Sequence, residues 1–307
     1  MTDRSETPLI SVIVPTFQRS QLLPRTLDSI YRQTHSNIQL IVVDDNLPGS
    51  EDAARTAAVL EPYRHRPGFL YLNTTGAIGA GAARNLAISQ CSGEYVAFLD
   101  DDDCYLPHKL EKQLRFMQAG GLDASYHDVR WLDERDKLVE ERTLDYTSDF
   151  STEALLKAHI LHSLCPTAVY MIRREALLRT EGFGEVPSGQ DFILMLRCIE
   201  SGMKIGYLPG AHVVQYLHKG DRISLGDNKI RGENLLYDLK HRYFHLLTAK
   251  ERRYVRFRHY AVLSFASLRS RRPLRAAGYA VRTVFSSPTS CVKEGIRYFR
   301  SKKGGRS

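Results

Sequence analysis

The 307-residue sequence lacks several features that would place it in familiar classes of protein. No hydrophobic run approaches the roughly 20 residues that a membrane-spanning helix needs, and the first residues, MTDRSETP, do not have a signal-peptide pattern. The five cysteines are scattered and form no CxxC pair, which argues against a disulfide framework or a zinc site. These absences predict a soluble globular protein of the reducing cytosol.

Two nucleotide-binding signatures are also missing. A dinucleotide-binding fold needs a glycine fingerprint after its first strand, and the turn there reads PTFQRS (15–20), without glycine. The glycines of TTGAIGAGAARN (74–85) fit GxGxxG poorly, and no Walker GxxxxGK[ST] occurs. Dehydrogenase and NTPase functions are therefore disfavoured, as is nucleotidyl transfer, which would use a Gly-rich phosphate loop at 15–20.

The net charge of +8 is distributed unevenly along the chain. Residues 229–307 contain 20 Lys and Arg but only 4 Asp and Glu. Residues 1–228 contain 23 Lys and Arg and 31 Asp and Glu. This shift predicts a boundary near residue 228, between a mildly acidic body (1–228) and a basic, mainly helical C-terminal extension (229–307).

Short apolar runs alternate with helical spacing through the first half of the chain. We expect strands at 9–17, 38–45, 68–73 and 94–100, and helices at 21–33, 51–63, 79–90 and from Pro107 to about residue 117. Such alternation predicts a parallel sheet with helices on both faces. Further helices are expected at 151–160, 189–202 and from 227 onward, and strands at 203–218.

Carboxylates follow two of the predicted strands: Asp44 and Asp45 after the second, and Asp100 to Asp103 after the fourth. Ligands of an open parallel sheet bind beyond the carboxyl ends of its strands. Asp100 and Asp102 would point to one side of an extended backbone, and an all-oxygen ligand set suits Mg²⁺ or Mn²⁺ with positions left for phosphate. The acidic run thus indicates a metal–diphosphate clamp, and a solvated acidic turn that caps the next helix is the alternative.

Three separated blocks resemble the family 2 glycosyltransferases, over roughly residues 8–225. They read SVIVPTFQRSQLLPRTLDSIYRQTHSNIQLIVVDDN (11–46), GAGAARNLAISQCSGEYVAFLDDDDCYLPHKL (79–110) and GFGEVPSGQDFILMLRCIESG (182–202). The resemblance implies an α/β GT-A fold, a Rossmann-like, mainly parallel sheet flanked by helices. It also implies an inverting transfer from a nucleotide-diphosphate sugar, with Mn²⁺ or Mg²⁺ as cofactor.

The resemblance assigns a nucleotide site to the strand ends. Asp45 would contact the base, and because a carboxylate only accepts hydrogen bonds it could read the N3–H of uracil or thymine, or the donors of guanine. UDP or dTDP is the favoured nucleotide, and Asp45 as a helix N-cap is the alternative. The other residues that the resemblance implies for nucleotide binding are Pro15, Thr16, Phe17, Arg84, Asp100 and Asp101. A core position for Phe17 and a structural or surface salt bridge for Arg84 are the alternatives.

The metal and the chemistry are assigned in the same way. Asp102 would be the direct metal ligand, joined by His218, and Asp191 would be the catalytic base that takes the proton of the acceptor hydroxyl. Gln190 stands where the family usually has Glu, so the resemblance implies the base but not how the acceptor is oriented. Arg222 would contact phosphate. A structural histidine at 218 and a helix cap at 191 are the alternatives.

The acceptor and partners follow from the family and from the basic extension. We expect transfer to a glycan or lipid-linked acceptor in cell-surface polysaccharide biosynthesis, at the inner face of the cell membrane. Basic residues beside aromatic and aliphatic ones in 240–307 predict binding to an anionic membrane surface, or else packing on the acidic body or an oligomer contact. The competing functions are a nucleic-acid-binding protein and an inactive scaffold; no nucleic-acid partner is expected for the enzyme.

Overall fold

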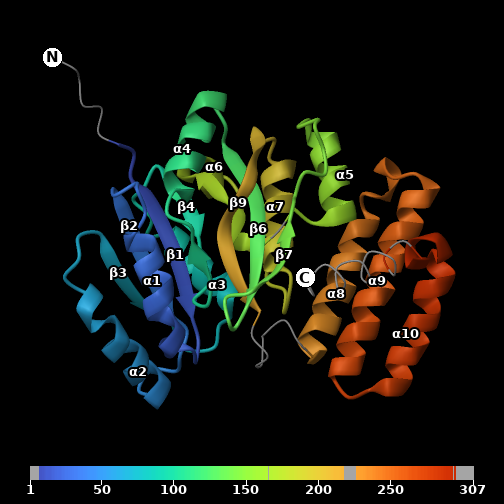
Figure 1. Cartoon of the computed structure of the whole chain (residues 1–307), viewed down its shortest axis with the longest axis horizontal. Helices are drawn as coiled ribbons and strands as arrows, with labels where there is room; N and C mark the ends of the chain where they lie inside the picture. Colours follow the sequence, from blue (N-terminus) through green and yellow to red (C-terminus); the bar gives the residue numbers. More distant parts are fainter. Residues whose placement is uncertain (1–6, 165, 218–225, 293, 295–307) are drawn as a thin grey trace. The chain divides into compact units, whose positions relative to one another are not determined.

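The computed structural model describes residues 7–164, 166–217, 226–292 and 294 (Figure 1). The chain forms two compact units. Unit 1 comprises residues 1–150, 164–185 and 191–218, and unit 2 comprises residues 151–163, 186–190 and 219–307. Two short segments from the middle of the sequence thus join the C-terminal part of the chain in unit 2.

Unit 1 is built on one sheet whose strands lie in the order β3-β2-β1-β4-β8-β6-β9-β5. Its first four strands are parallel, as the sequence predicted. They are β1 (Ile10–Thr16), β2 (Ile38–Asp44), β3 (Phe69–Asn73) and β4 (Tyr95–Phe98). Every residue of β1 is buried, which explains its unbroken apolar run, because a central strand of a parallel sheet is covered on both faces.

The other half of the sheet is mixed. Strand β8 (Met171–Arg173) pairs antiparallel with both β4 and β6 (Ala124–Asp133), and β9 (Ile205–Leu217) pairs parallel with β6. Strand β5 (Cys104–Tyr105) is antiparallel to β9, and β7 (Leu138–Arg142) is antiparallel to β6. The antiparallel pairs around β8 were not predicted.

The helices of unit 1 agree with the sequence pattern apart from a short extra one, α6. Leu23, Leu27 and Ile30 of α1 are fully buried, as expected for the apolar stripe of an amphipathic helix. Helix α1 begins later than predicted because residues 20–22 form a 3₁₀ turn (η1, Ser20–Leu22) ahead of it. The α-helices are α1 (Leu23–Tyr31), α2 (Glu51–Leu60), α3 (Ala80–Ile88), α4 (Lys109–Gly120), α6 (Arg174–Leu178) and α7 (Gln190–Glu200).

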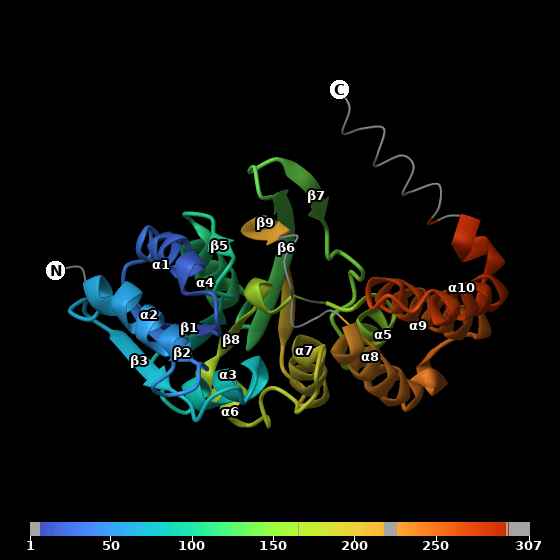
Figure 2. The same ribbon diagram turned by 90° about the horizontal axis from the view of Figure 1, so that it is seen from below.

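Unit 2 is helical in its described part. It contains α5 (Thr152–His162), α8 (Gly226–His241), α9 (Ala249–Arg269) and α10 (Pro273–Ser286), and α9 packs against the other three (Figure 2). Thr248 and Glu251 form a capping box at the start of α9, which satisfies backbone N–H groups that a helix N-terminus leaves open. Within the described residues, no helix combines the length and the apolar composition needed to cross a bilayer.

Candidate functional site

The acidic run Asp100–Asp103, here called the acidic loop, follows β4 at the edge where β1 and β2 also end. Ile13 of β1 lies opposite Phe98, the last residue of β4. Strand β1 continues to Thr16, whose hydroxyl donates a hydrogen bond to Asp101 Oδ2 at 2.8 Å. Asp101 and Asp103 are buried, whereas Asp100 and Asp102 are only partly covered. The loop therefore turns alternate carboxylates inward and outward.

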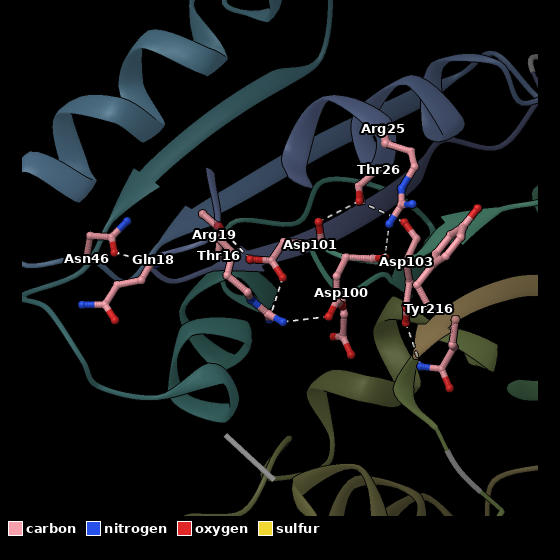
Figure 3. A network of polar contacts seen from close by, with 12 residues as sticks. Thr16, Gln18, Arg19, Arg25, Thr26, Asn46, Asp100, Asp101, Asp103 and Tyr216 are labelled. Atoms are coloured by element: carbon pink, nitrogen blue, oxygen red, sulfur yellow. Dashed lines mark hydrogen bonds and ion pairs between the residues drawn. The ribbon is translucent and has the colours of Figure 1, made fainter. Parts of the chain in front are cut away.

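Two segments of the chain neutralise and hold this loop. Arg19, in the turn after β1, forms an ion pair with Asp101 at 2.6 Å and a hydrogen bond with Asp102 Oδ2 at 2.7 Å. The hydroxyl of Thr26 in α1 donates to the carbonyl oxygens of Asp101 and Asp103, at 2.8 and 2.9 Å (Figure 3). Charge contacts from the turn after β1 and backbone contacts from α1 thus offset the repulsion between adjacent carboxylates.

Arg84 approaches the loop from α3. Its guanidinium forms an ion pair with Asp100, and its Cζ atom lies 5.2 Å from the centroid of the Phe183 ring. Arg84 is nearly buried, and its Nε atom has no hydrogen-bond partner among the described residues. A buried, unpaired donor of a guanidinium is uncommon, so this arginine retains capacity for a further acceptor.

Strand β9 supplies the remaining contacts of the acidic loop. Gln215 Nε2 donates to Asp103 Oδ2 at 2.7 Å, and the Tyr216 N–H donates to Asp103 Oδ1 at 3.2 Å. The Arg25 guanidinium stacks on the Tyr216 ring, with its Cζ atom 3.6 Å from the ring centroid, and it donates a hydrogen bond to the Asp102 carbonyl oxygen at 2.9 Å. Together these contacts fix the orientation of the Asp103 carboxylate.

Burial raises the pKa of both inward carboxyl groups, those of Asp101 and Asp103. It raises the pKa of the Asp101 carboxyl to about 7, and the charge of Arg19 acts in the opposite direction. Burial also raises the pKa of Asp103 well above its usual range, helped by the neighbouring charges of Asp102 and Asp100. Carboxylates that are moved away from water and toward one another resist ionisation, so a cation among them would be bound favourably.

The geometry of three carboxylates fits a divalent ion. Asp100, Asp102 and Asp103 each offer one oxygen, and these three oxygens lie within 4.8 Å of one another. Each of these side chains has a fixed partner: Arg84, Arg19 and Gln215 respectively. An oxygen-only set held by surrounding donors suits Mg²⁺ or Mn²⁺. The sequence singled out Asp102 for the metal, and the structure groups Asp103 with it.

The aspartates at the end of β2 organise the neighbouring loops. Both Thr74 Oγ1, at 2.6 Å, and the Ile78 N–H, at 3.0 Å, donate to Asp45 Oδ1, and the Gly79 N–H donates to Oδ2 at 2.8 Å. Gly79 has a φ of +92° directly before α3, a conformation that favours glycine. Asp45 therefore fastens the segment that begins α3, and these bonds use three of the four acceptor positions of a carboxylate.

Asp44 is buried beside Asp45. Its Oδ1 accepts from the backbone N–H and the side-chain amide of Asn46, at 2.9 and 2.7 Å, and its Oδ2 accepts from the Tyr71 hydroxyl at 2.7 Å. Burial raises the pKa of the Asp44 carboxyl, against the effect of these hydrogen bonds. These contacts are those of a side chain that holds the end of β2 in place.

The other predicted residues lie at several places. Pro15 is buried in β1, opposite Val43 and beyond the last pair with β4, and Phe17 is half-buried in the turn that follows. Asp191 is half-buried in the first turn of α7, where its Oδ1 accepts from the Phe192 N–H at 2.9 Å. Gln190 Nε2 donates to the Val186 carbonyl oxygen at 3.1 Å. His218 and Arg222 lie outside the described residues.

Sequence reasoning missed several residues that hold the acidic loop. Arg19 could have been found, because it follows β1 and the carboxyl ends of adjacent parallel strands meet at one edge. Thr26 and Arg25 gave no such signal, since α1 shows only amphipathic spacing. Gln215 and Tyr216 stand just before the predicted His218, but their contact with Asp103 joins residues 112 and 113 positions apart.

Comparison with known proteins places this chain in a family. The sequence profile described as "Glycosyl transferase family 2" matches residues 11–180. An uncharacterized glycosyltransferase of Rickettsia bellii is 31% identical over 189 residues, which cover 61% of this chain but only 26% of that protein. The putative teichuronic acid biosynthesis glycosyltransferase TuaG of Bacillus subtilis is 38% identical over 111 residues, covering 36% of this chain and 42% of TuaG.

Solved structures share the fold. Residues 1–349 of S. aureus TarS in complex with UDP-GlcNAc superpose with a TM-score of 0.61 at 17% identity, covering 93% of this chain and 92% of that one. The mannosyltransferase PcManGT of Pyrobaculum calidifontis, in complex with GDP-Man and Mn²⁺, superposes with a TM-score of 0.57 at 16% identity. The match covers 92% of this chain and 89% of that one. At these identities the likeness concerns the fold, which is the GT-A type that the sequence predicted.

Proposed function

The chain belongs to glycosyl transferase family 2, and we propose that it moves a sugar from a nucleotide diphosphate to a hydroxyl group of a glycan or lipid-linked acceptor, with inversion at the anomeric carbon. The observation that carries this proposal is the convergence of the acidic loop, Arg19 and Arg84 at the strand ends. This edge combines oxygen ligands for a cation with guanidinium donors for phosphate, which is the chemistry that a nucleotide diphosphate requires.

The nucleoside would lie at the ends of β1 and β2. Asp45 has one acceptor position left on Oδ2, which suits a single N–H donor such as N3–H of uracil or thymine. Half-buried Phe17 could stack on the base beside Pro15 and Thr16. A UDP or dTDP donor is therefore the proposed class, with the ribose near Asp100 and Asp101.

The diphosphate would lie between the acidic loop and Arg84. Asp102, Asp100 and Asp103 would hold the divalent ion, and Arg84 would donate its unpaired Nε–H to a phosphate oxygen. When bound, a divalent ion of this kind neutralises charge on the departing diphosphate. Arg19 and Gln215 would keep two of the ligands in orientation, because each already bonds one oxygen of its aspartate.

Asp191 would act as the base of the transfer. Its carboxylate would take the proton as the acceptor oxygen bonds to the anomeric carbon and the bond from that carbon to the phosphate oxygen breaks. The nucleotide diphosphate then leaves with the electron pair, and a single displacement inverts the anomeric centre. Gln190, which stands beside Asp191 in the first turn of α7, would orient the acceptor.

The biological setting is proposed from a relative and from composition. TuaG is named for teichuronic acid biosynthesis, which supports a role in cell-surface polysaccharide synthesis here. The basic C-terminal extension supports work at the inner, anionic face of the cell membrane, where a lipid-linked acceptor would be met. We also keep the boundary near residue 228 as a proposal for where the catalytic body ends.

A thermal-shift and hydrolysis screen tests the enzyme. Wild-type protein, Asp102→Asn and a control, Glu175→Gln, are mixed with UDP-, dTDP- and GDP-sugars and with Mn²⁺, Mg²⁺ or chelator. Glu175 is exposed and follows β8, whose residue Arg173 pairs with the opposite end of β4. We expect metal-dependent stabilisation and slow donor hydrolysis in the wild type and the control, and neither in Asp102→Asn. Unchanged activity in excess chelator would refute the metal site, and no response to any donor would refute the transferase.

A further inference from the structure

Helix α10 of unit 2 presents its apolar face to solvent. Its side chains Leu274, Val281, Val284 and Phe285, here called the α10 outer face, are 89%, 55%, 50% and 82% exposed. At 100° per residue these four fall on one side of the helix. An amphipathic helix of a globular protein normally turns such a stripe toward the core, so α10 is packed the opposite way round.

The packed side of α10 explains this orientation. It consists of small or polar residues, Ala276, Thr283 and Ser286, together with Tyr279. The hydroxyl of Ser264 in α9 donates to the Ala276 carbonyl oxygen at 2.9 Å, and the Tyr279 and Tyr260 rings stack at 6.3 Å. Short side chains allow α10 to lie close along α9, and the large apolar side chains are left on the outside.

The surroundings of the α10 outer face are strongly basic. Between Arg252 and Val292 the sequence contains nine arginines and no aspartate or glutamate. Arg275 and Arg282 are exposed and lie seven residues apart, so they line one flank of the outer face. Two further apolar side chains, Phe265 and Leu268, are 70% and 59% exposed in the last turns of α9. Large exposed apolar side chains grouped with basic residues mark an interaction site.

We infer that the α10 outer face inserts into an anionic lipid bilayer, with Arg275 and Arg282 at the level of the headgroups. Aliphatic and phenyl side chains on one side and arginines at the border are the arrangement of a helix that lies in a membrane interface. A symmetric contact with a second copy would set these arginines against one another, which is unfavourable. A nucleic acid would use the arginines but would leave Leu274, Val281 and Val284 without apolar partners.

This inference deepens the membrane part of the proposed function, but it rests on unit 2 alone. The test is sedimentation of the full chain with vesicles of phosphatidylglycerol and phosphatidylcholine, compared with vesicles of phosphatidylcholine alone. The apolar variant is Leu274→Ser/Phe285→Ser. Its matched control is Leu138→Ser/Val139→Ser in β7, where the same kinds of side chain are 53% and 51% exposed. The charge variant is Arg275→Gln/Arg282→Gln, and its control is Arg32→Gln/Arg115→Gln, whose arginines are also exposed.

We expect the wild type and both controls to sediment with the anionic vesicles, and less so at high salt. The apolar variant should lose at least about tenfold in partition, and the charge variant about tenfold, with loss of the preference for anionic lipid. Equal binding by every variant, or no binding by the wild type at low salt, would overturn the inference. Light scattering that showed a dimer, broken by the apolar variant while vesicle binding stayed unchanged, would also overturn it. An oligonucleotide that bound all variants equally and displaced them from vesicles would do the same.

Donor-induced thermal shift separates this result from the proposed activity. It depends on unit 1, so a variant that keeps the shift is folded and has lost only its membrane contact. A wild-type chain that sediments with vesicles but responds to no nucleotide sugar would support the α10 outer face and refute the transferase.

Discussion

Asn85 holds the backbone of Phe183 with both polar atoms of its side-chain amide. The Phe183 N–H donates to Oδ1 at 2.8 Å, and Nδ2 donates to the Phe183 carbonyl oxygen at 2.9 Å. Asn85 follows Arg84 in α3, and the Phe183 ring contacts the Arg84 guanidinium. It also forms a T-shaped pair with the Phe98 ring, with the ring centroids 5.3 Å apart. The pair therefore connects the arginine of the candidate diphosphate site with the segment that precedes α7.

This relationship gives a prediction about stability. Asn85→Ala should lower the free energy of unfolding by about 1–3 kcal/mol, because it leaves two backbone groups of Phe183 without partners. A Cβ atom on Gly182, whose φ is +63°, would lie 2.4 Å from Asn85 Oδ1, so Gly182→Ala should also destabilise. In the double variant the clash disappears, and the two effects should fall short of additivity by about 1 kcal/mol. Urea unfolding of the four proteins measures this coupling, and strict additivity would contradict it.

Asp191→Asn tests the proposed base. The amide keeps the size and polarity of the side chain but cannot take a proton, so turnover should fall by about 10²–10⁴. Binding of the donor, followed by titration calorimetry with Mn²⁺ or Mg²⁺ present, should stay near the wild-type value. Gln190→Ala is the neighbouring control and should change the apparent affinity for acceptor more than turnover. An Asp191→Asn enzyme with normal turnover would remove this residue from the chemistry.

Asp45→Asn tests the base pocket. The NH2 group of the asparagine would face either the Gly79 N–H or the Thr74 hydroxyl and the Ile78 N–H. All three are hydrogen-bond donors to Asp45, so these bonds would be lost on one side and the segment before α3 should loosen. We expect affinity for the nucleoside diphosphate to fall about tenfold, or about 1.4 kcal/mol. The nucleoside monophosphate should weaken by a similar factor, since both ligands share the base. Asp52→Asn, in the first turn of α2, is the control. If only the metal or sugar dependence changed, Asp45 would belong to another part of the site.

Lys109 offers a prediction about pH. Its side chain is fully buried, with Nζ 3.4 Å from the Tyr170 carbonyl oxygen and 4.3 Å from the centroid of the Tyr105 ring. Burial lowers its pKa well below the usual range. Burial also lowers the pKa of His127 and of His212, and the charge of Lys109 adds to this effect at both histidines. Below the ordinary lysine pKa of 10.5, the unfolded chain therefore binds more protons at this position than the folded chain.

The sign of the effect follows from that difference. The free energy of unfolding should rise with pH between the lowered folded-state pKa of Lys109 and 10.5, because the unfolded chain binds more protons than the folded chain in that range. Above 10.5 the lysine of the unfolded chain is also deprotonated, and the rise should end. Lys109→Met should flatten this rise and should increase the free energy of unfolding near neutral pH by about 1–3 kcal/mol. Exposed Lys112→Met, on the same helix, is the control. Chemical unfolding between neutral pH and pH 10 measures both effects, and an equal pH slope in wild type and Lys109→Met would show that Lys109 is not the cause.

The sequence by itself determined the local structure and the candidate chemistry of unit 1. The apolar runs fixed β1 to β4, and their alternation with helical spacing fixed the parallel half of the sheet, because both periods arise from backbone geometry within a few residues. The same local rule turned Asp100 and Asp102 away from buried Asp101 and Asp103. The order of the three blocks was sufficient to identify the family.

Only the tertiary structure decided what holds these residues in place. The contacts of Arg19 with the acidic loop, of Asn85 with Phe183 and of Gln215 with Asp103 join positions 82 to 112 residues apart, and no local pattern encodes such a choice of partner. Helix α10 is the clearest case. Its sequence predicts an amphipathic helix, but the close approach of α9 selects the side with small residues for packing and leaves Leu274 and Phe285 in solvent. Periodicity shows that a helix has two faces, whereas the space available beside its neighbour decides which face is buried.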